Sequence, residues 1–241
     1  MSNTYFQFKQ FTIHQDKCAM KVCTDACMLG AWTAGKLGGS GINNILDIGC
    51  GTGLLSLMLS QKINASIDAI EIDTDTAKQA GENISASPWA ANIRVIHTSL
   101  QEFIPQKKYD LIICNPPFYE NDLRSEHENK NVAKHDITLK LEELLLFVKE
   151  HLFDEGVFAL LLPFHRVVYL EKISNGQGLF VLEKLLIKQS TQHDYFRSVI
   201  ILSKKETIAP LTNELIIHDD ERQYTAAFEV LLKDYYLKLR S

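Results

Sequence analysis

Short apolar segments alternate with segments of helical spacing along most of this chain, and that alternation limits its fold more than any other feature. Strands that are separated by helices return to one sheet in parallel orientation. The predicted strands are 44–48, 66–72, 93–98, 109–114 and 157–162, and the predicted helices are 54–62, 74–85 (capped by Thr74), 139–152 and 164–174. The sequence therefore predicts an α/β fold with helices on both faces of a mostly parallel, doubly wound sheet.

The last third of the chain departs from this alternation. Segments 180–187 and 196–202 read as strands with no helical segment between them, so we expect them to be antiparallel. A short edge strand is expected at 211–217, and an amphipathic helix at 224–239. The prediction is a single domain over 1–241, with an N-terminal segment (1–42) and a Rossmann-like core (43–241). Its sheet should have seven strands, one of them reversed.

Composition excludes several classes of protein. The chain has 241 residues with 46% hydrophobic and 23% charged residues, which is ordinary for a globular domain and too apolar for a disordered one. The net charge of −5 means that any nucleic-acid binding needs a local basic patch. No apolar stretch approaches the ~18 residues of a membrane helix. We expect a cytoplasmic protein with no membrane attachment, five free thiols and no metal site.

A glycine-rich turn follows the first strand of the predicted core. Asp47 is followed by glycines at 49, 51 and 53, which let the backbone turn sharply and approach a ligand closely. The spacing is G-x-G-x-G and differs from the G-x-G-x-x-G of dinucleotide sites. Ligands of doubly wound sheets bind at the carboxyl ends of the strands. This turn is therefore the predicted centre of a cofactor site.

An acid ends the second predicted strand. Glu71 stands 24 residues after Asp47, at a position where a carboxylate can accept hydrogen bonds from both hydroxyls of a ribose. The two acids that come next, Asp73 and Asp75, are expected to serve the start of the following helix. Glu71 is thus the predicted ribose ligand.

A rigid Asn-Pro-Pro-Phe turn follows the fourth strand, at Asn115, Pro116, Pro117 and Phe118. Two prolines stiffen the turn and remove two backbone donors. The Asn115 amide oxygen and the Pro116 carbonyl can then accept both hydrogens of one –NH2 group, while Phe118 offers a flat face for a planar base. An aromatic amine is a poor nucleophile because its lone pair is delocalised. Two such acceptors would direct that lone pair toward an incoming methyl group, so that catalysis rests on positioning and desolvation.

These motifs, in this order, resemble the class I S-adenosylmethionine methyltransferases that act on planar amines. The closer resemblance, over nearly the whole chain, is to the bacterial tRNA adenine-N6 methyltransferases that modify adenosine 37 of tRNA1(Val). It is carried by the flanking segments Phe6-x-Phe8-Lys9-x-Phe11, Ser87-Pro88-Trp89-Ala90, Ala133-Lys134-His135 and Tyr224-Thr225.

The resemblance implies a class I methyltransferase fold, S-adenosylmethionine as methyl donor and S-adenosylhomocysteine as product. The N-terminal segment should pack over the cofactor site. The implied cofactor-binding residues are Lys21, Thr24, Asp25, Asp47, Gly49, Gly51, Gly53, Glu71, Ile72, Ser99, Leu100 and Asn115. The implied catalytic residues are Asn115, Pro116, Pro117 and Phe118. One position departs from the family, because Ser99 and Leu100 stand where an acid usually contacts the cofactor's adenine.

The expected partner is tRNA, bound through its anticodon loop, with no obligate protein partner. Reaching a base there requires that it leave its stack. Basic side chains must then hold the phosphates; the candidates are Lys9, Lys17, Lys21, Arg124, Lys130, Lys134, Arg197, Lys204 and Lys205.

The sequence leaves two other functions open. One is methylation of a glutamine side-chain amide in a release factor, since an amide nitrogen is also delocalised. That family usually has Tyr at the position of Phe118 and a preceding helical domain, for which only about 40 residues are present here. The other is a non-catalytic cofactor- or RNA-binding protein, against which the intact Asn115–Pro116 pair argues.

Overall fold

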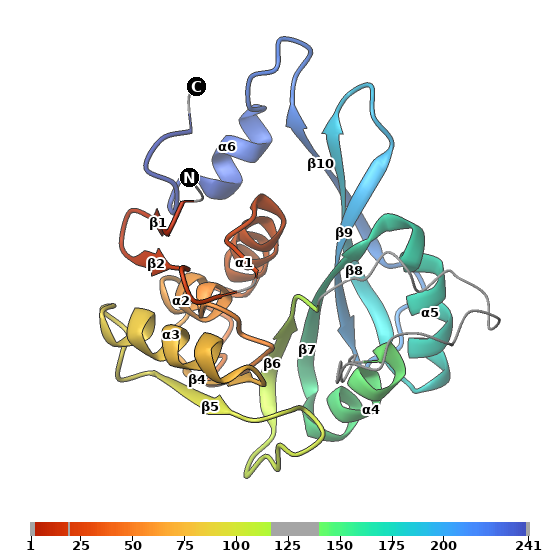
Figure 1. Ribbon diagram of the computed structural model, residues 1–241. Helices are drawn as coiled ribbons and strands as arrows, with labels where there is room; N and C mark the ends of the chain where they lie inside the picture. Colours follow the sequence, from red (N-terminus) through yellow and green to blue (C-terminus); the bar gives the residue numbers. More distant parts are fainter. Residues whose placement is uncertain (1–2, 19, 117–139, 240–241) are drawn as a thin grey trace, which may run out of the picture.

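One eight-stranded sheet forms the centre of the protein, in the strand order β10-β8-β9-β7-β6-β3-β4-β5 (Figure 1). The structure is a computed structural model and describes residues 3–18, 20–116 and 140–239. The strands of this sheet are β3 (Asn44–Ile48), β4 (Ser66–Glu71), β5 (Ile93–His97), β6 (Tyr109–Cys114), β7 (Leu152–Pro163), β8 (Phe180–Ser190), β9 (Tyr195–Ser203) and β10 (Leu211–His218).

Helices cover both faces of the sheet, as the alternation predicted (Figure 1). One face packs against α1 (Thr24–Leu37), α2 (Leu54–Ser60), α3 (Thr74–Ser85) and α6 (Ala226–Leu232), and the other against α4 (Leu141–His151) and α5 (Val167–Gly176). Strand β6 shows why the run 109–114 is almost wholly apolar. Leu111 and Ile113 face the first layer while Ile112 and Cys114 face the second, and all four are buried.

The predicted reversed strand is β9, which is antiparallel to both of its neighbours, β7 and β8. The other pairings of the sheet are parallel. The strand count needs a correction, from seven to eight. The segment expected as a short edge strand pairs with β8 along its whole length, from Leu211 opposite Glu183 to His218 opposite Ser190, and is a full member of the sheet.

Segments near the two ends of the chain, around residues 8–9 and 235–236, lie side by side (Figure 1). Strands β1 (Tyr5–Gln7) and β2 (Thr12–His14) form a hairpin that the sequence analysis did not predict. Phe8 and Phe11 stack in its turn with ring centroids 4.5 Å apart. The backbone amide of Lys9 donates to the carbonyl of Tyr235, and Phe8 forms a bridge with Tyr236. Phe8 and Phe11 of the opening motif are therefore core residues, and the partly buried Phe6 packs against them.

The terminal helix and the cap of α3 differ most from the predictions, while the ends of α2, α4 and α5 shift by one to three residues. The terminal helix ends at Leu232, because the chain after it turns to pair with the hairpin, although Tyr235 remains buried. Tertiary contacts override helical periodicity there. Helix α3 is capped by Asp73 and not by Thr74: the Asp73 carboxylate accepts the Thr76 amide at 2.8 Å.

The order of the strands locates the point where the winding of the sheet reverses. From β3 the chain proceeds outward through β4 and β5, and then crosses back to place β6 on the other side of β3. The carboxyl ends of β3 and β6 therefore flank the point where the winding direction reverses. Ligands of open α/β sheets bind at such a point.

Candidate active site

Three predicted site residues follow the ends of three adjacent strands. Ile48 pairs with Cys114 on one side and with Ile70 on the other, so Gly49, Asn115 and Glu71 come next at the same edge of the sheet. Neighbouring strands lie about 4.8 Å apart. The fold thus brings together the glycine turn, the predicted ribose ligand and the Asn-Pro turn, which lie up to 66 positions apart (115 − 49) in the sequence.

The glycine turn has the backbone conformation that its residues predict. Gly49, Gly51 and Gly53 have φ values of 67°, 55° and 83°. A Cβ added at Gly49 or Gly51 would meet no atom within 4 Å, whereas one at Gly53 would lie 3.2 Å from Ile84. The first two glycines therefore border open space, and the third is needed for packing against α3.

Glu71 holds this turn from the neighbouring strand. Its Oε2 accepts the Gly51 amide at 2.9 Å, and its Oε1 accepts the Asp73 amide at 3.0 Å. Only 9% of the residue is exposed. Because each carboxylate oxygen has two lone pairs, Glu71 can still accept hydrogen bonds from a ligand.

Asp47 lies beneath the turn and is fully buried. Its Oδ2 accepts the Ser56 amide at 3.1 Å and the Ser56 hydroxyl at 2.7 Å, while its Oδ1 has no hydrogen-bond partner. Burial raises the pKa of this carboxyl to about 7, against the opposing effect of the Ser56 hydrogen bonds. A buried acceptor without a hydrogen-bond partner lowers the stability of the folded state.

The other predicted residues at this edge have different surroundings. Ile72 keeps 49% of its surface exposed directly after Glu71. Ser99 is buried and caps a single helical turn, in which its hydroxyl donates to the Glu102 carboxylate at 3.0 Å and accepts the Glu102 amide at 3.2 Å. Leu100 packs against the core layer on the α4 side of the sheet. The prediction that Ser99 contacts the cofactor's adenine stays a prediction.

The N-terminal segment supplies the remaining predicted residues. Thr24 and Asp25 form the first turn of α1, and Lys21 is exposed in the segment before it. Asp25 accepts from Nε of Arg197 at 2.8 Å, which joins α1 to the start of β9 at the carboxyl edge of β7. That this segment covers a cofactor remains a prediction.

Asn115 and Pro116 are partly buried directly after β6. Pro117 and Phe118 lie outside the described residues, as do Arg124, Lys130 and Lys134. Most of the other candidate phosphate ligands already interact with groups of the protein itself. Carboxylates pair with Lys17, Arg197, Lys204 and Lys205, and Lys9 donates to the carbonyl of Lys233.

The structure also shows three supporting residues that sequence reasoning missed. Asn83 donates to the carbonyls of Thr52 and His14, and Gln79 contacts residues 16–18, so α3 connects the glycine turn to the N-terminal segment. His97 Nε2 lies 3.0 Å from the Ile72 carbonyl and holds the chain just after Glu71. Gln79 and Asn83 could have been noticed in the sequence, because both are polar residues on the core-facing side of the predicted helix 74–85.

Comparison with known proteins identifies the family. Residues 36–157 match the sequence family of the methyltransferase small domain. The tRNA1(Val) (adenine(37)-N6)-methyltransferase of Parabacteroides distasonis is 40% identical over 241 residues, covering 99% of this chain and all of that protein. The enzyme of the same name from Dyadobacter fermentans is 41% identical over 240 residues, covering 98% of each. This chain belongs to the tRNA1(Val) (adenine(37)-N6)-methyltransferase family.

The fold of this methyltransferase is likewise shared with solved structures. An Agrobacterium tumefaciens protein titled a "predicted O-methyltransferase" superposes with a TM-score of 0.64 at 18% identity, covering 88% of this chain and 96% of that one. The class I methyltransferase fold expected from the sequence is thereby confirmed. Within the described residues, no group of three or more His, Cys, Asp or Glu could hold a metal ion, and no helix is long and apolar enough to cross a membrane. All five cysteines are free thiols.

Proposed function

We propose that this methyltransferase transfers a methyl group from S-adenosylmethionine to N6 of adenosine 37 in tRNA1(Val). Membership of the family, over the full length of its relatives, carries the proposal. The site supports it, because Asn115 and Pro116 follow the strand beside the glycine turn. We further propose that the enzyme works in the cytoplasm, where its substrate is made.

The residues at the carboxyl edge suit an adenosyl cofactor that carries positive charge. Glu71 can accept from ribose hydroxyls, and the half-exposed Ile72 offers an apolar surface for a flat base. The buried Asp47 carboxyl lies beneath the glycine turn, where its ionised form favours a positively charged ligand electrostatically. When bound, S-adenosylmethionine supplies a methyl group on a sulfonium, a leaving group that needs no metal to activate it.

Asn115 and Pro116 prepare the amine. The amide oxygen of Asn115 and the carbonyl of Pro116 accept the two N6 hydrogens, so that the nitrogen lone pair is directed away from the ring. As the new N–C bond forms, the methyl–sulfur bond would break and leave S-adenosylhomocysteine, while the nitrogen becomes positively charged and the two oxygens stabilise it. One proton then leaves to solvent. Pro117 and Phe118 are proposed to fix this turn and to stack on the base.

The deciding experiment is nucleoside mass spectrometry of tRNA treated with enzyme and isotopically labelled S-adenosylmethionine. We expect labelled N6-methyladenosine in tRNA1(Val) alone, and none in a transcript with guanosine in place of adenosine 37. Labelling of other isoacceptors would contradict the proposed substrate. Labelled N5-methylglutamine in a release factor, with unlabelled tRNA, would favour the glutamine alternative.

A further inference from the structure

We propose that a polar groove at the amino ends of β3, β4 and β5 binds the phosphate of a nucleotide, at a second site separate from the active site. The groove consists of two cavities of about 330 and 300 Å³ that share Ser66, Ala91 and Asn92 in their walls. Ser66 begins β4, and Ala91 and Asn92 precede β5, whereas the active-site residues follow the opposite ends of these strands.

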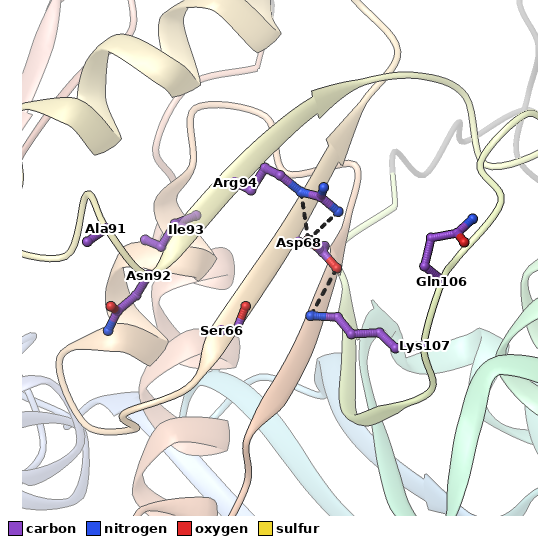
Figure 2. Close-up of a pocket in the computed structure, with 8 residues that line it drawn as sticks. All are labelled: Ser66, Asp68, Ala91, Asn92, Ile93, Arg94, Gln106 and Lys107. Carbon is purple, nitrogen blue, oxygen red and sulfur yellow. Dashed lines mark hydrogen bonds and ion pairs between the residues drawn. The ribbon is translucent and has the colours of Figure 1, made fainter.

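The path of the chain explains why this part of the sheet is accessible. Strand β5 is joined to β6 by residues 98–108, all of them described, and this connection contains one helical turn in place of a helix. Helices α4 and α5 pack on β7 and β8, farther along the same face. The connection then brings Gln106 and Lys107 to the edge of the larger cavity, opposite Arg94 of β5 (Figure 2).

Two cations share one carboxylate in the larger cavity. Arg94 and Lys107 approach Asp68 from two sides (Figure 2). Oδ1 of Asp68 lies 2.9 Å from Nη2 of Arg94, and its Oδ2 lies 3.3 Å from Nζ of Lys107. The hydroxyl of Tyr109 also donates to Oδ2 at 3.0 Å. Two positive charges against one negative charge leave the cluster with a net charge of +1, on a chain whose net charge is −5.

This arrangement leaves hydrogen-bond donors available to a ligand. Asp68 is 4% exposed and already satisfied by Arg94 and Tyr109, so it does not need the second cation. Only Nε and Nη2 of Arg94 contact it, out of five guanidinium N–H donors. The Arg94 side chain is 69% exposed. Asp68 thus holds Arg94 and Lys107 in place, which lowers the entropy cost of binding an anion between them.

The remaining walls favour a nucleotide over a simple anion. Ser66 and Asn92 line both cavities, Gln106 lines the larger one, and Asn43 and Asn64 line the smaller one. Hydroxyl and carboxamide groups can each donate to and accept from a sugar or a base. A phosphate between Arg94 and Lys107 would place the rest of a nucleotide along these groups. The nucleotide could be a free one or part of an RNA strand; both have the same phosphate chemistry.

The first test is a titration of the full-length protein with adenosine monophosphate and with inorganic phosphate, at constant ionic strength, followed by NMR of backbone amides. We expect saturable shifts around residues 66, 92, 94 and 107, with adenosine monophosphate binding more tightly. The double variant Arg94→Gln/Lys107→Gln should bind at least about 100-fold more weakly, since each of the two charge-assisted contacts contributes about 1.5 kcal/mol or more. The matched control, Lys78→Gln/Lys172→Gln, removes the same charge from exposed positions of α3 and α5 and should bind like wild type.

Loss of both cations leaves Asp68 with Tyr109 alone and could unfold the protein, so a milder variant is included. Lys107→Gln keeps the Arg94–Asp68 pair and should retain the wild-type melting temperature while binding about tenfold more weakly. The idea is overturned if neither probe shifts these amides, or if the Arg94 and Lys107 variants bind both probes as tightly as wild type does.

The second test identifies the source of the phosphate and rests on the proposed function. If the nucleotide belongs to tRNA, Lys107→Gln should raise the KM for tRNA without changing kcat, and should lower the salt dependence of binding by about one unit in the log–log slope. If the nucleotide is free, the methylation parameters should not change while the amide shifts persist. Because the first test requires no methyl transfer, a failure of the proposed function is distinguishable from a failure of the groove.

Discussion

The amide of Gly51 donates to Oε2 of Glu71 at 2.9 Å, so the acid at the end of β4 holds the glycine turn at the end of β3. One carboxylate therefore has two roles, as an anchor of the turn and as the proposed acceptor of ribose hydroxyls. Its other oxygen accepts the Asp73 amide and fixes the entry into α3. Substitutions at Glu71 can separate the two roles.

We expect Glu71→Ala to weaken S-adenosylmethionine binding by about 100-fold or more, because it removes two charge-assisted contacts to the ligand. Glu71→Gln keeps one acceptor oxygen near Gly51 and should lose about tenfold. Calorimetric titration measures both affinities, and circular dichroism checks the fold. The control is Glu82→Gln on the exposed face of α3, where the carboxylate pairs with Lys17. Equal affinities for wild type and Glu71→Ala would place the ribose elsewhere.

Asn115→Ala should reduce methyl transfer severely and leave cofactor binding within a few-fold. Truncation removes one of the two proposed acceptors of the N6 hydrogens, and loss of one preorganised group of this kind costs about 10²–10³ in kcat. Single-turnover methylation of tRNA measures the rate, and calorimetry measures the affinity. Asn175→Ala, at an exposed position of α5, is the matched control. A turnover rate near that of wild type would remove Asn115 from the mechanism.

Local patterns predicted the parts of the site that lie within one strand and the turn after it. The apolar run 109–114 predicted β6 with both faces covered, and three glycines after Asp47 predicted a sharp turn, in which all three glycines have positive φ. The strand ends then located Glu71 and Asn115 at one edge of the sheet. In these segments the residues that determine the conformation are close in sequence.

Contacts between distant segments could not be predicted in this way. Asp25 and Arg197 form an ion pair across 172 positions, and the C-terminal helix ends early because Tyr235 and Tyr236 pair with the N-terminal hairpin. The apolar spacing within 224–239 does not show that the chain leaves the helix to pair with the N-terminal hairpin. The free Oδ1 of Asp47 also depends on burial by several elements.

Gly53→Ala should destabilise the protein more than Gly51→Ala. Both positions have positive φ, which costs a residue with a Cβ about 1–2 kcal/mol. At Gly53 the new Cβ would also press on Ile84 at 3.2 Å, whereas at Gly51 it would enter open space. Chemical denaturation should therefore give a larger loss of unfolding free energy for Gly53→Ala. Gly51→Ala should instead lose affinity for S-adenosylmethionine, since the open space beside it is the proposed ligand site. Equal stability losses would contradict the packing role given to Gly53.

Asp47 should make both stability and cofactor affinity depend on pH near neutrality. Burial raises the folded-state pKa of this carboxyl to about 7 from an ordinary value of 3.8. As pH rises from 4 to 7, the unfolded chain loses this proton before the folded chain does, so Asp47 should lower the unfolding free energy across that range and add no further change above it.

Ionised Asp47 is also the form that attracts a cation, so the affinity for S-adenosylmethionine should rise as pH increases through about 7. Asp47→Asn keeps an oxygen for the Ser56 hydrogen bonds and cannot ionise. Its unfolding free energy should lack the fall between pH 4 and 7, and its weaker cofactor affinity should vary less with pH than that of wild type. Denaturation and calorimetric titrations at pH 5, 6, 7 and 8 measure both. Parallel pH profiles for the two proteins would show that the Asp47 carboxyl does not titrate in this range and that another group governs binding.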